Sequence, residues 1–325
     1  MTHCLGCLKQ ITTDSVYCNA CIKNVFNNCK LNPAALDFDR NKYTSIKYDM
    51  SGHFSISGVQ DKISLKIENK KLVPTERGGQ YILKPIPETS VPRFQKDIPA
   101  NEHITMQIAK QLFKIKTAEN ALIRFSDGEL AYIVKRFDVV EGGKIPQEDF
   151  CQLLQISEES HGNNYKYDSS YQNAAEIIIR SCPAHKIEIE KFYFLVLFDY
   201  FFSNGDAHLK NFSLVQSIDK DYILSPAYDL LATSLHFPDE SRMALDLFDD
   251  YETESFKKNG FYKRDDFLHF AEILKINTQQ AVRYIERFYN LEDKCRIMIE
   301  RSFLTPEAKI QYALLFTDRL KAMKD

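Results

Sequence analysis

The hydrophobic pattern of this chain changes character near its middle. From about residue 52 to 140 apolar and polar positions alternate, as over 63–67, and an Asp127-Gly128 pair between two alternating runs is typical of a β-hairpin. Within this half only 101–113 has helical spacing. After Gly143 the spacing becomes helical, and we expect helices over about 146–158, 171–182 and 188–203, with more beyond 265. A strand-rich half followed by a helical half predicts an α+β fold of two lobes with a cleft between them.

Composition narrows the class of protein. A length of 325 residues suits one two-lobed unit or two domains, and a formal charge of −3 gives nucleic acid or an anionic membrane no general attraction. The longest apolar run, 192–202, contains Asp199 and is far shorter than the ~20 residues that cross a bilayer. The N-terminus lacks the apolar core of a secretion signal. We therefore expect a cytoplasmic protein without membrane contact, whose cysteines are thiols or metal ligands.

Four of the eight cysteines lie near the N-terminus as two Cys-x2-Cys pairs, Cys4 with Cys7 and Cys18 with Cys21. Thiolates from two such pairs typically make a closed, tetrahedral and structural Zn²⁺ site of the zinc-ribbon kind. A chance cluster of redox-active thiols is the alternative. We expect a cysteine knuckle over residues 1–30 that holds zinc and whose loss leaves catalytic chemistry largely intact. A linker is expected to follow over 31–51.

A short polar loop carries the strongest chemical pattern. Asp206 and Asn211 stand five residues apart directly after an apolar helix, and Asp229 follows a second apolar stretch. This is the spacing used in phosphoryl transfer, where the aspartate accepts a hydroxyl proton and the amide and second carboxylate hold Mg²⁺. Alternatively, the first two residues form a capped turn and Asp229 is an unrelated N-cap. His208 lies between them; no cysteine or histidine stands at ligand spacing, so a loop-holding hydrogen bond is favoured over a proton shuttle or zinc ligand.

Three upstream features favour the catalytic interpretation. Small residues over 55–62 join two strand-like runs and allow backbone N–H groups to approach phosphate, although for this segment taken alone a simple hairpin turn is the stronger interpretation. Lys84 ends a strand and Glu102 opens a helix, where each also has an ordinary structural explanation. The order of loop, lysine, glutamate, Asp-x4-Asn and aspartate is nevertheless the order of the parts of a protein kinase.

Together these segments resemble the HipA-like serine/threonine kinases of bacterial toxin–antitoxin systems. The resemblance runs from about Gly52 to near the C-terminus and rests on the motifs SISGVQDK, YILKP, NEH, VKRFD, PQEDFCQLL, NGDAHLKNFSL and SPAYDLL. It implies an ATP- and Mg²⁺-dependent protein kinase of bilobal, protein-kinase-like fold. The N-lobe would cover 52–138 and the helical C-lobe 139–325.

The resemblance also implies roles for individual residues. Asp206 matches the catalytic base, Asn211 and Asp229 the Mg²⁺ ligands, and Lys84 the phosphate-binding lysine. The other expected nucleotide contacts are the loop residues Ser57, Gly58, Val59, Gln60, Asp61 and Lys62, the interlobe hinge Lys135, Arg136 and Phe137, and His208 and Tyr228 beside the metal ligands. Ser55 matches the loop serine that family members autophosphorylate, and Ser57 is a second candidate.

The chain lacks the additional N-terminal subdomain of longer family members and so resembles the short, HipT-type members, in which a separate small protein supplies it. The implied partners are that protein, a helix-turn-helix antitoxin through which nucleic acid is reached only indirectly, and a protein substrate such as an aminoacyl-tRNA synthetase. Two other functions stay open: a small-molecule or lipid phosphotransferase, and a pseudokinase scaffold that uses the knuckle for recruitment.

Overall fold

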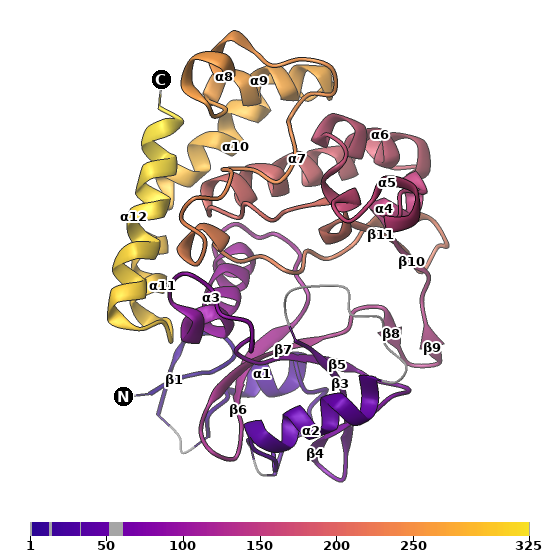
Figure 1. Cartoon of the computed structure of the whole chain (residues 1–325), viewed down its shortest axis with the longest axis vertical. Coiled ribbons are helices and arrows are strands. Elements are labelled where there is room, and N and C mark those ends of the chain that lie inside the picture. Colours follow the sequence, from indigo (N-terminus) through magenta and orange to yellow (C-terminus); the bar gives the residue numbers. More distant parts are fainter. Residues whose placement is uncertain (1, 13–14, 33, 52–60, 325) are drawn as a thin grey trace.

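The structure is a computed structural model that describes residues 2–12, 15–32, 34–51 and 61–324. Two lobes follow one another along the chain (Figure 1). The first contains β1 (Thr2–His3), β2 (Gln10–Ile11), α1 (Asn19–Asn24), α2 (Arg40–Ser51), β3 (Ile63–Glu68), β4 (Lys71–Pro74), β5 (Tyr81–Lys84), η1 (Gln95–Asp97), α3 (Ile98–Gln111), β6 (Asn120–Arg124) and β7 (Leu130–Lys135).

The small hairpin of β8 (Val139–Val140) and β9 (Gly143–Lys144) leads into the second lobe. That lobe contains β10 (Gln147–Asp149), α4 (Phe150–Leu154), α5 (Glu158–His161), η2 (Tyr165–Tyr167), α6 (Tyr171–Ser181), α7 (His185–Phe201), η3 (Leu209–Asn211), β11 (Ser213–Gln216), β12 (Tyr222–Leu224), η4 (Thr233–Leu235), α8 (Glu254–Asn259), α9 (Arg264–Ile273), α10 (Thr278–Asn290), α11 (Glu292–Arg301) and α12 (Pro306–Ala322). The predicted division into a strand-rich and a helical lobe is confirmed.

An antiparallel sheet in the order β4-β3-β5-β7-β6 forms the centre of the N-lobe. The hairpin predicted at Asp127-Gly128 is present, because β6 and β7 pair from Asn120 with Val134 to Arg124 with Leu130. Alternation along each strand gives the sheet two faces. On β5 this places Lys84 on the face toward the other lobe and leaves the opposite face to the N-lobe core.

Helix α3 is shared between the lobes. It packs against strands β6 and β7 and also against α11, so nearly all of its residues are buried. Just beyond its end, Phe113 stacks on Phe288 with ring centroids 4.5 Å apart and packs edge-on against Phe198 and Phe202. The helix that carries Glu102 is therefore held at its C-terminal end by the core of the C-lobe.

The cysteine knuckle has no core of its own. Its apolar residues, among them Leu5, Tyr17 and Phe26, are buried in one cluster with residues of the sheet such as Leu83. The knuckle also meets the outer edge of the sheet, where Leu122 N–H donates to Leu5 O and Tyr17 Oη donates to Leu122 O, both at 2.8 Å. An edge strand whose N–H and C=O groups are satisfied in this way cannot recruit another strand.

Residues 31–51 are not the linker that we expected. Leu36 N–H donates to Arg124 O at 2.8 Å and Ser126 N–H to Phe38 O at 3.1 Å, so the segment continues along the edge of β6. It then forms helix α2, whose Tyr43 is fully buried against Phe125. The polar composition concealed this packing because only a few apolar side chains carry it.

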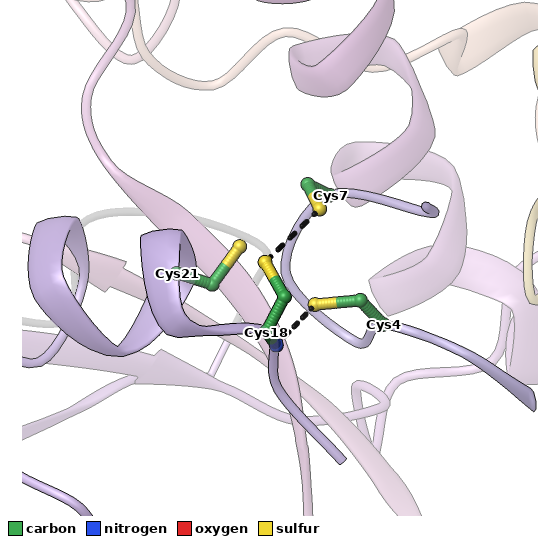
Figure 2. A group of neighbouring side chains, drawn as sticks. All are labelled: Cys4, Cys7, Cys18 and Cys21. Carbon is green, nitrogen blue, oxygen red and sulfur yellow. Dashed lines mark hydrogen bonds between the residues drawn. The ribbon is translucent and has the colours of Figure 1, made fainter. Parts of the chain in front are cut away.

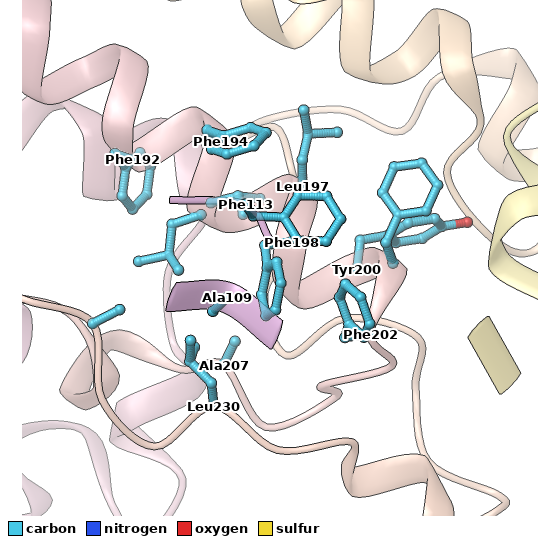
Figure 3. Packing of buried hydrophobic residues seen from close by; sticks show 14 of the residues in the cluster. Ala109, Phe113, Phe192, Phe194, Leu197, Phe198, Tyr200, Phe202, Ala207 and Leu230 are labelled. Atoms are coloured by element: carbon cyan, nitrogen blue, oxygen red, sulfur yellow. The ribbon is translucent and has the colours of Figure 1, made fainter. Parts of the chain in front are cut away.

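Helix α7 crosses the centre of the C-lobe and is apolar on nearly every side, as expected for a helix enclosed by others. In a chain without tryptophan, phenylalanine and tyrosine fill this core. Figure 3 shows Phe194, Phe198 and Phe202 of this region packed around Phe113, with Ala207 and Leu230 of the site loops close below. The loops that carry Asp206 and Asp229 therefore pack, through Ala207 and Leu230, on the aromatic core of this lobe.

The helix expected over 146–158 is shorter and begins later. Residues Gln147–Asp149 form β10, which pairs with β11 in a three-stranded antiparallel sheet, β10-β11-β12. Asp149 then caps α4, since its carboxylate accepts the N–H of Gln152, and the helix ends at Gln155 in a left-handed conformation. Sheet pairing and a capping box thus override the helical spacing.

Within the described ranges no helix is both long and apolar enough to span a membrane.

Candidate active site

A cavity of about 720 Å³ opens between the two lobes. It is lined by most of the residues that the sequence singled out: Lys62, Lys84, Lys135, Arg136, Phe137, Asp206, His208, Asn211, Tyr228 and Asp229. Asp61 lies beside the cavity and forms an ion pair with Lys47 of α2. Ser55, Ser57, Gly58, Val59 and Gln60 lie outside the described residues, so the predicted nucleotide loop is represented here by its last two members.

Lys84 forms a double ion pair at the floor of this cavity. Its Nζ lies 2.7 Å from Glu102 Oε1 and also contacts Asp229 Oδ1. Burial raises the pKa of Glu102 to about 7 in spite of the ammonium beside it. Burial also disfavours the charged lysine, but the two carboxylates outweigh it and raise the pKa of Lys84. The predicted lysine–glutamate pair is therefore formed, although its residues are 18 positions apart in the chain.

Three consecutive residues of α3, all fully buried, reach in three different directions. Glu102 meets Lys84, while Asn101 Nδ2 donates to Ala232 O at 2.9 Å and Asn101 Oδ1 accepts the N–H of Ala232 at 3.0 Å. His103 Nε2 lies 3.1 Å from Gly6 O in the cysteine knuckle. Successive helical residues differ in direction by about 100°, so one turn of helix connects the strand lysine, the Asp229 loop and the knuckle.

The loop of Asp206 is shaped by close backbone contacts. Gly205 N–H donates to Thr233 Oγ1 at 2.7 Å, and a Cβ at Gly205 would lie 2.5 Å from Ser241 O, so a side chain does not fit there. Asn204 Oδ1 accepts the N–H of Asp206 at 3.3 Å. These contacts hold the Asp206 carboxylate, which is 45% exposed, at the mouth of the cavity.

Tyr167 makes a contact that the sequence did not reveal. Its hydroxyl donates to Asp206 Oδ1, and Lys166 Nζ lies 4.0 Å from the same oxygen. Burial and the neighbouring carboxylate raise the pKa of Tyr167, so the phenol keeps its proton at neutral pH. A segment without recognisable motif thus supplies a partner for the candidate base.

His208 does not hold the loop through its ring as expected. The ring packs edge-on against Tyr167, and Nε2 lies 4.0 Å from Asp206 Oδ1. Nδ1 is buried without a hydrogen-bond partner among the described residues. Burial lowers the pKa of His208 to about 4, although Asp206 acts in the opposite direction. The imidazole is therefore neutral near pH 7, and it is the backbone N–H of His208 that donates to Asp206 O at 2.8 Å.

The donor set beside Asp206 fits a magnesium ion. Asn211 Oδ1 is buried and, within the described part of the chain, has no hydrogen-bond partner, so an acceptor oxygen is left for a cation. Asp229 adopts a left-handed backbone conformation, φ 56°, and lines the same cavity. Burial acts to raise the pKa of Asp229, but Lys84 outweighs it and holds that pKa below its ordinary value. Amide and carboxylate oxygens are the ligands that Mg²⁺ prefers.

Aromatic packing closes the rear of the cavity. Tyr228 Oη donates to Lys210 O at 2.9 Å and contacts Ser213 Oγ, and its ring lies 5.8 Å from that of Phe137 in the hinge. Arg136 forms an ion pair with Asp138 rather than pointing at the metal ligands. The hinge and the Asp229 loop therefore meet through a pair of rings.

The four sulfurs of Cys4, Cys7, Cys18 and Cys21 lie within 4.8 Å of one another. Figure 2 shows the four side chains gathered in one place. A tetrahedral zinc site with Zn–S bonds of about 2.3 Å needs sulfurs about 3.8 Å apart, so small adjustments would close one here. A Cβ at Gly6 would lie 2.6 Å from the sulfur of Cys21, and the cluster therefore requires glycine at that position.

The acid–base chemistry of the cluster also favours a cation. Hydrogen bonds from Cys21 and Cys7 lower the pKa of Cys4, whereas the sulfurs of Cys4 and Cys7 raise the pKa of Cys21. The backbone N–H groups of Gly6 and Cys18 add further donors to the sulfur of Cys4, at 3.4 and 3.2 Å. One thiolate is thus stable here, but four adjacent thiolates need a metal to balance their charge.

The sequence indicated one of two further site residues, Asn101, but not the other, Tyr167. Asn101 lies in the NEH motif, so its presence in the site was visible even though its partner was not. Tyr167 follows a polar stretch without periodicity, and nothing in the sequence connects it with Asp206, which lies 39 positions later. Long-range hydrogen bonds of this kind leave no local pattern.

Comparison with known proteins identifies relatives among kinases. A protein of Haemophilus influenzae named "Putative kinase" is 28% identical over 305 residues, which cover 89% of this chain and 86% of that protein. "Putative kinase Y4dM" of Sinorhizobium fredii is 30% identical over 259 residues, covering 72% of this chain. Those residues make up 58% of Y4dM, so the chain spans little more than half of that relative.

Two solved structures share the fold. One comes from the complex of the Shewanella oneidensis toxin–antitoxin proteins HipA and HipB with operator DNA; it has a TM-score of 0.63 and 19% identity over 83% of this chain and 65% of the other. The other is the Helicobacter pylori proinflammatory kinase CtkA, with a TM-score of 0.54 and 16% identity over 83% of this chain and 92% of the other. The profile of the HipA-like C-terminal domain matches residues 54–295, almost three quarters of the sequence. This chain therefore belongs to the family of the HipA-like C-terminal domain, a kinase family.

Proposed function

We propose that this protein is an ATP-dependent serine/threonine protein kinase that acts as the toxin of a HipA/HipT-type toxin–antitoxin system. One observation carries the proposal: Lys84, which is paired with the buried Glu102, lines the same interlobe cavity as Asp206, Asn211 and Asp229. A lysine–glutamate pair with a base and two oxygen ligands is the constellation that kinases use.

In this proposal each lobe contributes one end of the nucleotide. Lys84 and Lys62 face the cavity from the N-lobe and would neutralise phosphate charge. The hinge residues Lys135 to Phe137 border the space that would receive the adenine ring of ATP. Asn211 and Asp229 would hold Mg²⁺, which, when bound, offsets the charge on the β- and γ-phosphates. Lys84 contacts Asp229 in this structure, so metal binding would exchange one cationic partner of that carboxylate for another.

Asp206 is the proposed catalytic base. Its carboxylate already accepts a hydrogen bond from a hydroxyl, that of Tyr167. A serine or threonine hydroxyl of the substrate would take over this place, give its proton to Asp206 and attack the γ-phosphoryl group, and ADP would leave. His208, uncharged at neutral pH, would contribute packing against Tyr167 and not a proton.

Transfer of ³²P from ATP tests this assignment. Wild-type protein should label a protein substrate in cell extract or itself, whereas Asp206→Asn and Asp229→Asn should be inactive. Because Asp229 is the proposed metal ligand, its variant should also bind Mg²⁺-ADP more weakly, while Asp206→Asn should bind it normally. Activity retained by both variants would refute the kinase assignment, and label found only in small molecules would identify a small-molecule phosphotransferase.

The biological part of the proposal concerns partners. The Shewanella HipA was solved with HipB and operator DNA. By analogy we propose a helix-turn-helix antitoxin for this chain, contact with nucleic acid only through it, a cytoplasmic protein target, and a separate small partner protein of the HipT kind. Autophosphorylation of Ser55 or Ser57 would add negative charge beside the nucleotide phosphates and weaken ATP binding.

Expression in a bacterial host tests the toxin assignment. The wild-type chain should arrest growth, the Asp206→Asn variant should not, and co-expression of the cognate antitoxin should restore growth. Mass spectrometry of the wild-type protein should find phosphate on the loop serines, and protein carrying Asp206→Asn should lack it. Normal growth at high expression of active kinase would refute a toxin.

A further inference from the structure

The Lys84–Glu102 ion pair joins two elements that are held separately. Lys84 ends strand β5, and Glu102 lies in the second turn of helix α3. In kinases this pair must be formed before phosphoryl transfer, and the position of the glutamate helix controls it. Any structure that fixes α3 relative to β5 therefore also fixes the proposed nucleotide site.

The cysteine knuckle contacts both elements, in each case close to the ion-pair residue. Tyr81, on β5 three residues before Lys84, donates its hydroxyl to Val25 O at 3.0 Å. His103, directly after Glu102, places Nε2 3.1 Å from Gly6 O. Both side chains are fully buried. Nearer the end of α3, Gln111 Nε2 donates to Cys7 O at 2.9 Å.

These contacts divide between the two Cys-x2-Cys turns. Gly6 and Cys7, which meet α3, belong to the first turn. Val25, which meets β5, ends the short helix α1 that begins after Cys18 and carries Cys21, and its N–H donates to Cys21 O at 2.9 Å. Besides a few backbone hydrogen bonds and the shared burial of apolar residues such as Leu5 and Phe26, the cluster of four sulfurs joins the two turns, and Figure 2 shows the sulfurs of both turned toward one centre.

From this arrangement we infer that the metal-loaded knuckle is a staple between β5 and α3, which positions Glu102 against Lys84 for the proposed kinase reaction. Tyr81, His103 and Gln111 are positioning residues that transmit the state of the sulfur cluster to the site. Without metal the two turns can separate, α3 shifts relative to β5, and nucleotide binding and turnover fall. This inference rests on the proposed function, and it replaces our expectation that catalysis is independent of the knuckle.

The test compares full-length proteins at a temperature far below unfolding. Zinc content, Mg²⁺-ADP affinity, hydrogen exchange of residues 98–111, and kcat and KM for ATP are measured for each. The double variant Cys18→Ser/Cys21→Ser should lose zinc, lose exchange protection in α3 and bind Mg²⁺-ADP at least tenfold more weakly. Cys29→Ser, which removes a thiol outside the cluster, should match the wild type in all measurements.

His103 separates positioning from metal binding. His103→Leu should retain zinc, because no sulfur is changed, but should lose protection in α3 and several-fold in nucleotide affinity and kcat. His103→Gln keeps an N–H donor for Gly6 O and should recover most of both. If His103 only stabilised the fold, both variants would be less stable than the wild type, and His103→Gln would not recover nucleotide affinity.

Some results would overturn the staple alone. These are a wild-type protein that holds no zinc, or a zinc-free protein whose α3 protection and Mg²⁺-ADP affinity equal those of the wild type. If the cysteine variant does not fold, His103→Leu and Tyr81→Phe decide, since both leave the sulfurs in place; unchanged affinity and protection in both would refute the proposal. A wild-type protein that binds no nucleotide would instead refute the proposed kinase function, and the staple with it.

Discussion

In the proposed mechanism Tyr167 occupies the acceptor oxygen of Asp206 that a substrate hydroxyl would need. Its phenol donates to Asp206 Oδ1 at the mouth of the cavity, where the ring is held by packing on His208. A hydrogen bond to a charged, partly exposed carboxylate contributes about 1 kcal/mol. In the proposed reaction a substrate would have to offset that contribution before its own hydroxyl could reach Asp206.

The variant Tyr167→Phe should therefore be the more active enzyme toward its protein substrate. We expect the KM for protein to fall about fivefold, the equivalent of that hydrogen bond, with the KM for ATP unchanged. Tyr165→Phe, at a nearby tyrosine that lines the cavity, serves as the control and should behave as the wild type. A loss of kcat in the first variant would show instead that Tyr167 orients the base.

Asp199 is a buried carboxyl of α7 that the proposed mechanism does not use. It is 3% exposed, and its Oδ1 accepts a hydrogen bond from Asn204 at 2.8 Å. Burial raises the pKa of Asp199 from 3.8 to about 7, against a smaller opposite effect of Asn204. The folded state therefore holds a proton that the unfolded chain releases above about pH 4, and this group destabilises the fold as the pH rises from about 4 to about 7.

The variant Asp199→Asn should abolish that dependence, since its carbonyl can still accept the Asn204 amide. Relative to the wild type, its free energy of unfolding should rise by about 1.4 kcal/mol per pH unit between pH 4 and 7, and level off above. Urea unfolding at pH 4.5, 5.5, 6.5 and 7.5 measures this. Asp219→Asn, at an exposed position, is the control, and parallel curves for Asp199→Asn and wild type would contradict the prediction.

Single residues were predictable where a motif fixes their role and not where only the tertiary fold does. Lys84 and Glu102 could be paired in advance because their order along the chain follows that of a kinase. The contacts of Asn101 with Ala232 and of Tyr167 with Asp206 could not be predicted, because each joins segments that are far apart in the sequence and that no local pattern connects.

The geometry of the first Cys-x2-Cys turn depends on a single residue, Gly6. Gly6 lies so close to Cys21 that an added Cβ would meet its sulfur at 2.6 Å. The variant Gly6→Ala should therefore displace Cys21 and reduce zinc content from one ion per chain to well below that. Lys23→Ala, on the exposed side of α1, should leave the metal in place. Full zinc occupancy of Gly6→Ala, measured by atomic absorption, would contradict this geometry.

Elements with strong alternation or helical period were predicted well, whereas those decided by a few contacts were not. The strands around Asp127-Gly128 and the helix that carries Glu102 follow from periodicity alone. Helix α2 did not follow from periodicity, because its sequence is mostly polar and it packs on the lobe mainly through the buried side chain of Tyr43. The late start of α4 reflects a capping box that competes with an apparently continuous helical pattern.

For the molecule as a whole, the change from alternating to helical spacing was enough to predict two lobes with a site between them. It was not enough to show that the lobes share α3, which packs against β6 and β7 of the sheet and is followed by Phe113 in the aromatic core of the C-lobe. Nor did it show that the first forty residues are part of the N-lobe. Both facts depend on contacts between segments that are distant in the sequence. Such contacts form when the chain packs, and no local sequence pattern predicts them.

The covering of β6 bears on how the protein behaves when it is shortened. Residues 5, 17, 36 and 38 satisfy backbone groups along that strand, so a chain that begins at residue 39 would present an open sheet edge together with bare apolar surface. Such an edge pairs readily with an identical edge of a second molecule. We expect the shortened chain to self-associate with rising concentration in light scattering while full-length protein does not. A monomeric short form would contradict this. In the folded protein the N-terminal forty residues thus keep this edge of the sheet from pairing with a second molecule.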